Sequence, residues 1–551
     1  MSTRKWWHLD PGGSILGLLF ALLSLTPSLL PRPALLQGVL AALSFSLGYL
    51  LGVLVWALLR RLVTWRPSRR MQRALWLGYV AAWVLALAAL ASLGTLWQNE
   101  VRALVEMPPL EAANVGMFLV SFLALGTLLL AFGKGVRRLW SIGRLRYGAI
   151  GASIGMAFSA LVLIAGAVWG IAVAIDGVYL ERNGSPDAEV DEPSSQYRSA
   201  GTDSAIGWET LGRHGANFVG GGPSAAEITA VTDAPAIEPI RVYAGLASAD
   251  SVEERASLAV AELERTGAFE RSVLIVATPT GSGWLEPQTM DSVEYLSGGD
   301  TASVAMQYAY TPSWVSFVFD PDAPVDAARV LFDAVHEKWS TLPEADRPVL
   351  ISYGLSLGAH GSQAVFGSVS EIRERTDGAL FVGSPNGSEL WRTLQASRDN
   401  GSPAWRPVLD GGREVRWMSR AGDESLLPAA WEPPRVLYLQ HATDPVTWLG
   451  PELIWESPEW LEDSQRGADV SPSMRWIPGV TAMQVTVDML MGESVPARHG
   501  HNYGDVVTLG WREVIGDLGN SHGGLSEAAF ERVQRVIEAY AIPEAAGSSG
   551  G

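Results

Sequence analysis

The stretch RPVLISYGLSLGAHGS, residues 347–362, decides the fold that the rest of the chain is expected to build. It opens with the apolar run VLI at 349–351, which favours a buried β-strand. A G-x-S-x-G sequence centred on Ser356 follows, and a helix is expected over residues 359–374. Strand, G-x-S-x-G and helix in this order are typical of a nucleophile elbow, a sharp turn that presents a serine hydroxyl above the edge of a sheet.

Each part of this elbow has a physical role. The flanking glycines, Gly354 and Gly358, are expected to let the strand and the helix backbones approach closely. The backbone N–H of Leu357 is expected to face an oxygen on which negative charge develops. The alternative is a glycine-rich turn with an incidental serine, but the flanking strand and helix favour the elbow.

From residue 240 onwards the sequence alternates between strand-like and helix-like patterns. Such alternation is typical of an α/β fold, a mostly parallel sheet with helices on both faces. We expect strands at 240–246, 273–277, 303–308, 349–353, 379–382 and 435–440, and helices at 251–266, 287–296, 325–339, 359–374 and 525–540.

Charge divides the chain into two parts of opposite sign. Residues 1–175 hold 15 Lys and Arg against 4 Asp and Glu, whereas the remainder holds 25 against 54. The acidic part argues against a nucleic-acid partner, because phosphates would be repelled. The absence of cysteine excludes disulfides, thiolate metal sites and a cysteine nucleophile. We expect a membrane domain over 1–175, a polar linker over 176–204 and a catalytic domain over 205–551 that folds by itself.

The N-terminal part contains apolar runs that approach or exceed the roughly 18–20 residues needed to span a bilayer. Pro27 is expected to kink or end the first of these runs. The five predicted spans are 13–30, 35–59, 74–97, 116–132 and 148–175. They contain no charged residue, so anchoring, or lateral access for lipid, is the expected role rather than an ion pathway.

Basic residues gather in alternate loops, which predicts the orientation. They precede the first span and fill the second-to-third and fourth-to-fifth connections, whereas the other two loops are poor in them. The positive-inside rule then places the N-terminus in the cytoplasm and everything after the fifth span outside the cell membrane. The basic residues are Arg4, Lys5, Arg60, Arg61, Arg66, Arg69, Arg70, Arg73, Lys134, Arg137, Arg138, Arg144 and Arg146.

Two further catalytic groups are expected downstream of Ser356, in the order acid and then histidine. Asp444 directly follows the predicted strand 435–440 and its short HAT extension, where the carboxyl end of a parallel strand would present it to a ligand. An Asx-turn before Pro445 is the alternative role of Asp444. The downstream histidines are His499, His501 and His522, and the loop RHGHNY favours the first two. The His-x-His pair could bind a metal, but no H-E-x-x-H set accompanies it.

A second oxyanion donor is expected from the loop TPTGSG, residues 278–283. Thr280 or Gly281 would supply the N–H, since proline has none. The alternative is Gly245-Leu246, after an earlier strand. Two glycine-rich passages, 212–215 and 220–223, could cradle a phosphate, but no G-x-x-x-x-G-K-[ST] sequence is present, which favours plain loops.

The chain resembles a family of bacterial, mainly actinobacterial, membrane proteins classed as α/β-hydrolases with a dedicated N-terminal membrane domain. The resemblance covers nearly the whole chain and implies that Ser356, Asp444 and His501 form a catalytic triad, with His501 preferred over His499. Leu355 departs from the pattern, where an acidic residue is expected before the serine. The matching stretches are SLTPSLLPR (24–32), VLIVATPTGSGW (273–284), GGDTASVAMQYAYTPSW (298–314), GLSLGAHGS (354–362), YLQHATDPVTW (438–448) and GHNYGDV (500–506).

Together these patterns predict a membrane-anchored serine hydrolase, esterase-like or lipase-like, that needs no cofactor or metal. Its expected partners are an acyl ester, favoured to be a lipid because the site is tethered at a bilayer, and the membrane lipids around its N-terminal part. An acyltransferase that uses the same acyl-enzyme is one alternative. A non-enzymatic envelope or transport protein with a degenerate hydrolase domain is the other.

Overall fold

The chain was analysed as a computed structural model, which describes residues 9–62, 68–188, 190–427, 429–504, 506–516 and 524–540. The predicted site residue His522 and the basic residues Arg4, Lys5 and Arg66 lie outside these ranges. The chain divides into two compact units. The N-terminal unit comprises Met1–Ile171, Leu449–Asp463 and Gly467–Val495, and the sheet unit comprises Ala172–Trp448, Ser464–Arg466 and Pro496–Gly551.

The strands predicted from residue 240 onwards all belong to one sheet, whose seven strands within the described ranges are parallel throughout. Their order across the sheet is β1-β3-β2-β4-β5-β7-β6, so the α/β prediction is confirmed. The edge strand β6 was not predicted, because its four residues are too few to give a clear pattern. The strands are β1 (Ile240–Ala244), β2 (Val273–Thr278), β3 (Thr301–Met306), β4 (Val349–Leu355), β5 (Gly378–Val382), β6 (Val415–Met418) and β7 (Arg435–Leu439).

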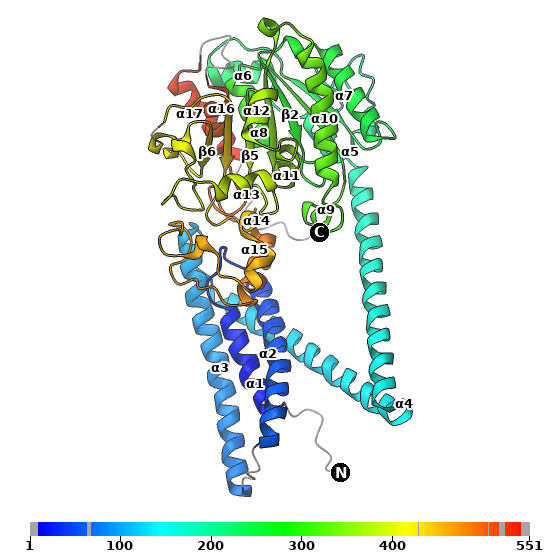
Figure 1. Cartoon of the computed structure of the whole chain (residues 1–551), viewed down its shortest axis with the longest axis vertical. Helices are drawn as coiled ribbons and strands as arrows, with labels where there is room; N and C mark the ends of the chain where they lie inside the picture. The colour runs from blue at the N-terminus through cyan, green and yellow to red at the C-terminus, as the bar shows by residue number, and fades with distance from the viewer. Residues whose placement is uncertain are drawn as a thin grey trace. The chain divides into compact units, whose positions relative to one another are not determined.

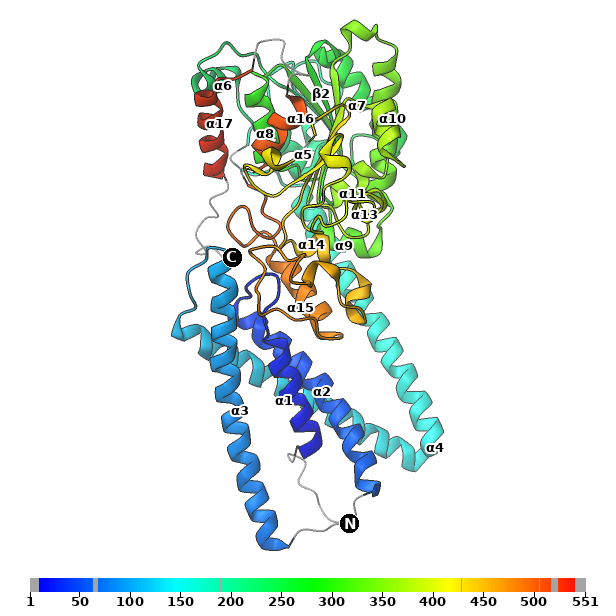
Figure 2. The ribbon, with the colours of Figure 1, turned by 60° about the vertical axis from the view of Figure 1, so that its left-hand side comes forward.

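Helices cover both faces of this sheet (Figure 2). Helices α7 (Val252–Thr266) and α10 (Ala323–Ser340) pack on one face, and α8 (Pro287–Leu296), α16 (Val506–Ile515) and α17 (Glu527–Tyr540) lie on the other. The strands are buried on both faces, which explains their continuous apolar runs. The remaining helices of the sheet unit are α5 (Gly212–Gly220), α6 (Ala225–Thr232), α9 (Ser313–Phe319), α11 (Leu357–Gln363), α12 (Val369–Arg375), α13 (Glu389–Ala396) and α14 (Pro445–Trp448).

The helix predicted after the elbow, 359–374, is two helices rather than one. Helix α11 ends at Gln363, and α12 begins only at Val369. The Ser368 side chain accepts a hydrogen bond from the N–H of Glu371 at 3.2 Å and so caps α12. A serine that caps its own helix start offers the backbone an alternative to continuing the preceding helix.

The N-terminal unit is built from long apolar helices. Of the described helices, α2 (Ala34–Leu62), α3 (Arg69–Leu104) and α4 (Ala112–Asn183) are long and apolar enough to cross a membrane. Helix α4 contains both the fourth and the fifth predicted spans and bends at Gly148, where φ is 73° (Figure 1). Helix α1 (Pro11–Ser24) has 14 residues and ends before Pro27, so it is shorter than the predicted first span.

Large apolar side chains on α2, α3 and α4 are exposed, which soluble surfaces rarely show over such lengths. This exposure agrees with association with a membrane. Examples are Leu54, Leu58, Val84, Leu85, Val120, Leu128, Phe132, Ile150 and Leu163.

The described part of the predicted polar linker 176–204 begins as helix and continues mostly as turns and coil that contact the sheet unit. Helix α4 continues through its first part to Asn183. Further on, Arg198 pairs with Arg241 of β1 as an isolated parallel bridge, and both side chains are buried. The hydroxyl of Ser204 donates to Glu262 of α7 at 2.8 Å. Residues 195–204 therefore contribute to the edge of the sheet unit.

The N-terminal unit also includes residues 449–463 and 467–495, here called the inserted segment. This segment lies between Asp444 and His501 in the sequence. Its helix α15 (Val480–Asp488) packs against α1 and α2. This division differs from the predicted continuous catalytic domain over 205–551.

The inserted segment is fixed by one fully buried carboxylate. Asp488 accepts hydrogen bonds from the hydroxyl of Ser28 (3.1 Å) and from the N–H groups of Leu29 (3.0 Å) and Leu30 (3.3 Å). It also pairs with the guanidinium of Arg32, whose Nε lies 2.8 Å away. These four partners lie in the SLTPSLLPR stretch, so that stretch wraps around an acid far away in the sequence.

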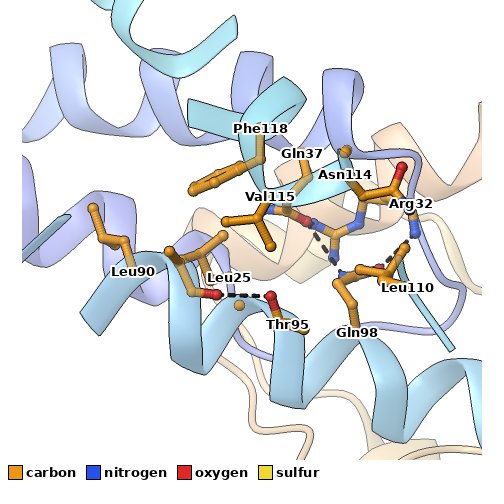
Figure 3. A pocket seen from close by; sticks show the side chains of 13 residues that line it. Leu25, Arg32, Gln37, Leu90, Thr95, Gln98, Leu110, Asn114, Val115 and Phe118 are labelled. Atoms are coloured by element: carbon orange, nitrogen blue, oxygen red, sulfur yellow. Dashed lines mark hydrogen bonds between the residues drawn. The ribbon is translucent and has the colours of Figure 1, made fainter. Parts of the chain in front are cut away.

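Beside Arg32 the N-terminal unit contains a small cavity of about 20 Å³ (Figure 3). Arg32, Gln37 and Gln98 meet at its polar end, and apolar side chains line the rest. Since one water molecule needs roughly 10–15 Å³, this cavity is too small for an acyl chain.

Candidate active site

Ser356 occupies a strained turn between β4 and α11. Its backbone has φ 56° and ψ −122°, a region that residues other than glycine rarely adopt. The N–H of Ser356 donates to the carbonyl of Val382 on the neighbouring strand β5 at 2.8 Å, which holds the turn in place. The serine is only partly buried, as a nucleophile must be.

The two glycines of G-x-S-x-G are required by close backbone contacts, as predicted. A Cβ atom on Gly354 would lie 2.3 Å from the carbonyl oxygen of Gly358, and one on Gly358 would lie 2.1 Å from that of Thr278. No side chain fits at such distances. The start of α11 is therefore pressed against both its own strand and the end of β2.

Asp444 and His501 lie in direct contact, although 57 residues separate them. The Nδ1 of His501 donates to Oδ2 of Asp444 at 2.8 Å, and both side chains are almost completely buried. Asp444 stands beyond the carboxyl end of β7, and His501 lies in the loop before α16. This pairing fixes the tautomer of His501, because an Nδ1 that donates leaves Nε2 to act as an acceptor.

The imidazole of His501 lies against the turn that follows β5. A Cβ atom on Gly383 would lie only 2.5 Å from its Cε1 atom. Gly383 follows Val382, whose carbonyl accepts from Ser356. The sheet order β4-β5-β7 accordingly brings the predicted nucleophile, the histidine and the acid to one edge of the sheet.

The hydrogen bonds of Asp444 are compatible with both roles considered for it. Its Oδ1 accepts from the N–H of Val446 at 2.8 Å, which is the Asx-type turn ahead of α14. Its Oδ2 accepts from His501 and also from the hydroxyl of Tyr503 at 2.7 Å. Burial raises the pKa of Tyr503 well above its ordinary value, so its hydroxyl keeps the proton that it donates.

His499 takes a different position from His501. Its carbonyl accepts from the N–H of Asn502 at 3.1 Å within a tight turn, and its side chain is partly exposed. The geometry brings His501 rather than His499 to Asp444.

Three side chains that support the histidine loop were not predicted. The ring of His441 stacks on Tyr503 with 4.2 Å between centroids, and its Nδ1 donates to the carbonyl of Gly500 at 2.9 Å. The N–H of Gly500 donates in turn to the hydroxyl of Thr443 at 2.9 Å. His441, Thr443 and Tyr503 lie in the YLQHATDPVTW and GHNYGDV stretches, which was the signal available in the sequence.

The predicted oxyanion donors differ in their present hydrogen bonds. Leu357 is the first residue of α11, so its N–H has no acceptor within the helix. The N–H of Thr280 donates to the carbonyl of Trp284 (2.9 Å), and that of Gly281 donates to the hydroxyl of Ser313 (3.1 Å). The loop after β2 adjoins the elbow strand β4, as that prediction requires.

The alternative donors, Gly245 and Leu246, follow β1 at the far edge of the sheet, where β3 and β2 separate them from β4. The N–H of Gly245 donates to the hydroxyl of Ser248 (3.0 Å). The N–H of Leu246 donates to the side-chain oxygen of Gln307 (3.3 Å). Neither residue is positioned to serve the elbow.

Across the described part of the chain, no group of three or more His, Asp or Glu side chains is arranged as a metal site. The arrangement instead offers a hydroxyl on a strained turn, an imidazole oriented by a carboxylate and a helix N-terminus beside them. These are the components of nucleophilic acyl transfer.

Comparisons with known proteins identify the family to which this fold belongs. A family profile described as "Alpha/beta-hydrolase family" matches residues 240–530, which include the whole sheet and the elbow. A second profile, described as "Alpha/beta-hydrolase family N-terminus", matches residues 25–223. Searches of curated proteins and of solved structures gave no match. The chain belongs to this alpha/beta-hydrolase family and carries both the family's N-terminal region and its hydrolase fold.

Proposed function

We propose that the protein is a membrane-anchored serine hydrolase that cleaves acyl esters through Ser356, His501 and Asp444. The observation that carries this proposal is the 2.8 Å hydrogen bond between His501 Nδ1 and Asp444 Oδ2, at the same edge of the sheet as a serine on a strained elbow. Such a carboxylate holds the imidazole in the tautomer that can accept a proton at Nε2.

In the first step the hydroxyl oxygen of Ser356 attacks the ester carbonyl while its proton passes to Nε2 of His501. The tetrahedral intermediate then collapses, and the same proton is given to the departing alcohol. In the second step water attacks the acyl-enzyme, His501 takes its proton, and the carboxylic acid leaves as Ser356 recovers its hydrogen. Asp444 stabilises the imidazolium that forms in both steps.

The N–H of Leu357 is the first donor proposed for the oxyanion. Gly281 is the better second candidate, because its N–H is bound to a side-chain hydroxyl, that of Ser313, which can rotate away. The N–H of Thr280 is bound to a backbone carbonyl and is less easily released.

A lipid-derived ester is the proposed substrate class. Helices long and apolar enough to cross a membrane precede the hydrolase fold in the same chain, and this supports a site that acts on membrane lipids. An acyltransferase would use the same acyl-enzyme with an alcohol or amine acceptor in place of water.

The test is hydrolysis of a p-nitrophenyl ester by the full chain in a neutral detergent. Ser356→Ala and His501→Ala should each lower kcat by roughly 10⁴-fold or more, and the double variant should lose little beyond that. Asp444→Asn should fold but lose activity, because the amide favours the wrong imidazole tautomer. His499→Ala is the matched control and should retain far more activity than His501→Ala. Full activity in Ser356→Ala would overturn the proposal.

A further inference from the structure

A second cavity, in the sheet unit, has the composition of an anion-binding site. Its volume is about 160 Å³, against the roughly 10–15 Å³ needed by one water molecule, so a small anionic group fits. It is lined by the end of α4, the start of α5 and two loops that follow β2 and β3. The lining residues are Tyr179, Arg182, Asn183, Arg213, His214, Ser282, Tyr310 and Pro312.

Basic groups dominate this lining. Arg213 forms an ion pair with Asp187, which leaves the other guanidinium, Arg182, with no ion pair among the described residues. The positive charges of Arg213 and Arg182 both act on His214. Guanidinium groups are the side chains best suited to phosphate, because their planar forks donate two parallel hydrogen bonds.

His214 supplies an independent sign that a ligand is missing. Its Nδ1 atom is buried and has no hydrogen-bond partner among the residues that the structure describes. A buried polar atom without a partner destabilises the fold unless something satisfies it. Burial, followed by the positive charge of Arg213, lowers the pKa of His214 to about 4; Asp187 opposes this shift and Arg182 adds to it. A bound anion would oppose the effect of the two positive charges.

The glycine-rich passage GRHG, residues 212–215, forms this wall. It was expected to be a loop, but it is the first turn of the nine-residue helix α5. The start of α5 has no side-chain cap, so its first N–H groups add partial positive charge on this side of the cavity.

The cavity also adjoins the proposed site of chemistry. Ser282 directly follows Gly281 in the loop after β2. Pro312 precedes Ser313, whose hydroxyl accepts from the N–H of Gly281. Helix α4 continues from the predicted fifth span to the cavity: Asn183 lies eight residues beyond Ile175, the end of that span, or about 12 Å along the helix. The headgroup layer is only about 5–8 Å thick on each side of a bilayer, so the cavity would lie just outside this layer.

We propose that this cavity binds the phosphate headgroup of an acyl lipid, which makes phosphate-bearing lipids the substrate class. This inference rests on the proposed hydrolase function where it takes the bound lipid to be a substrate whose acyl ester is cleaved. Binding of the headgroup itself does not depend on catalysis. Arg182 and Arg213 pair with the phosphate oxygens, and Nδ1 of His214 donates to it.

The test measures binding to the full chain in neutral detergent, in a Ser356→Ala background that prevents turnover. The probes are dioctanoyl phosphatidic acid and its neutral counterpart, dioctanoylglycerol, with sn-glycerol 3-phosphate as a headgroup without acyl chains. Phosphatidic acid should bind at least tenfold more tightly than dioctanoylglycerol. The variant Arg182→Gln, at an exposed position, should weaken phosphatidic acid binding by roughly tenfold, as expected for loss of one hydrogen bond to a charged group.

Arg535→Gln removes the same charge from an exposed site on α17 and is the matched control, expected to keep wild-type binding. Equal affinity for the two lipids, or an Arg182→Gln variant that behaves like Arg535→Gln, would overturn the proposal. If the chain bound glycerol phosphate but bound the two lipids equally well, a lipid ligand would be ruled out. The cavity would then be a site for free phosphate esters. Tight binding of phosphatidic acid by a wild-type chain that hydrolyses no ester would support this inference and contradict the hydrolase function.

Discussion

The hydroxyl of Tyr503 lies 2.7 Å from Oδ2 of Asp444, the same oxygen that accepts the hydrogen bond of His501. Oδ2 of Asp444 therefore accepts hydrogen bonds from two buried groups, the hydroxyl of Tyr503 and Nδ1 of His501. Both groups draw on the negative charge of this oxygen. Tyr503 also stacks on His441, which holds the histidine loop through Gly500. The position of the Asp444 carboxylate is therefore fixed by Tyr503 as well as by His501.

Tyr503→Phe should keep the ring and remove only the hydroxyl. We expect kcat/KM for a p-nitrophenyl ester to fall on the order of tenfold, because a hydrogen bond to a charged group contributes that much. Tyr438→Phe is the matched control, since its buried hydroxyl donates to the neutral amide of Gln363 at 3.3 Å. Equal activity of the two variants would show that Tyr503 has no part in orienting Asp444.

The buried pair of Arg32 and Asp488 should hold the inserted segment in the N-terminal unit. Asp488→Asn leaves the guanidinium buried without its counter-charge, which destabilises proteins by about 3–5 kcal/mol. We expect a lower Tm for the full chain in detergent and faster proteolysis within residues 467–495. The double variant Arg32→Gln/Asp488→Asn should recover part of the loss. A single variant as stable as the wild type would contradict this role.

The pair of Arg32 and Asp488 also affects the expectation that a chain beginning at residue 205 folds by itself. A chain that begins at residue 205 lacks Arg32 and the Ser28–Leu30 backbone, so Asp488 would lose its partners and be exposed. Such a chain also lacks Ser199 and Ser204, whose side chains form hydrogen bonds with the sheet unit. We therefore expect activity assays to require the full chain.

His214 should make stability depend on pH. Its pKa in the folded chain is about 4 against 6.5 ordinarily, so the unfolded chain binds more protons between these values. Stability should be fully present above pH 6.5 and fall as the pH decreases towards 4. In phosphate-free buffer, the Tm of His214→Gln should fall less than that of the wild type between pH 7.5 and pH 5. His336 and His360 contribute equally to the pH dependence of the wild type and of His214→Gln. An identical decrease of Tm in the two proteins would therefore contradict the role assigned to His214.

The basic loops predict that the N-terminus lies in the cytoplasm and the hydrolase fold outside it. Reporter domains active only inside or only outside the cell, fused after Gly551, should report the outside. A fusion after Arg70, in the most basic loop, is the control and should report the inside. An inside signal from the C-terminal fusion would contradict the predicted orientation.

Local patterns were sufficient to predict most of the sheet and the residues around Ser356. The strand before Ser356 is a continuous apolar run because β4 is buried on both faces, and Gly354 and Gly358 follow from the close contacts of the turn. Asp444 was predictable because a parallel strand presents its carboxyl end to the site.

Long-range contacts could not be predicted in the same way. Asp488 looks like any helix-terminal acid in the sequence, and only the fold brings it to Arg32, 456 residues away. No local pattern indicates that the inserted segment groups with the N-terminal unit, because the contacts of α15 with α1 and α2 join residues more than 400 positions apart. The second donor for the oxyanion depends on Ser313, whose contact with Gly281 has no local signal.

The proposed hydrolase function depends most directly on Ser356 as a nucleophile, and covalent labelling by a fluorophosphonate probe tests this role. The full wild-type chain in detergent should be labelled, and mass spectrometry of its peptides should place the adduct on Ser356. Ser356→Ala should not be labelled, and His501→Ala should be labelled far more slowly than His499→Ala. A wild-type chain that stays unlabelled, or a Ser356→Ala chain labelled at the wild-type rate, would contradict the account.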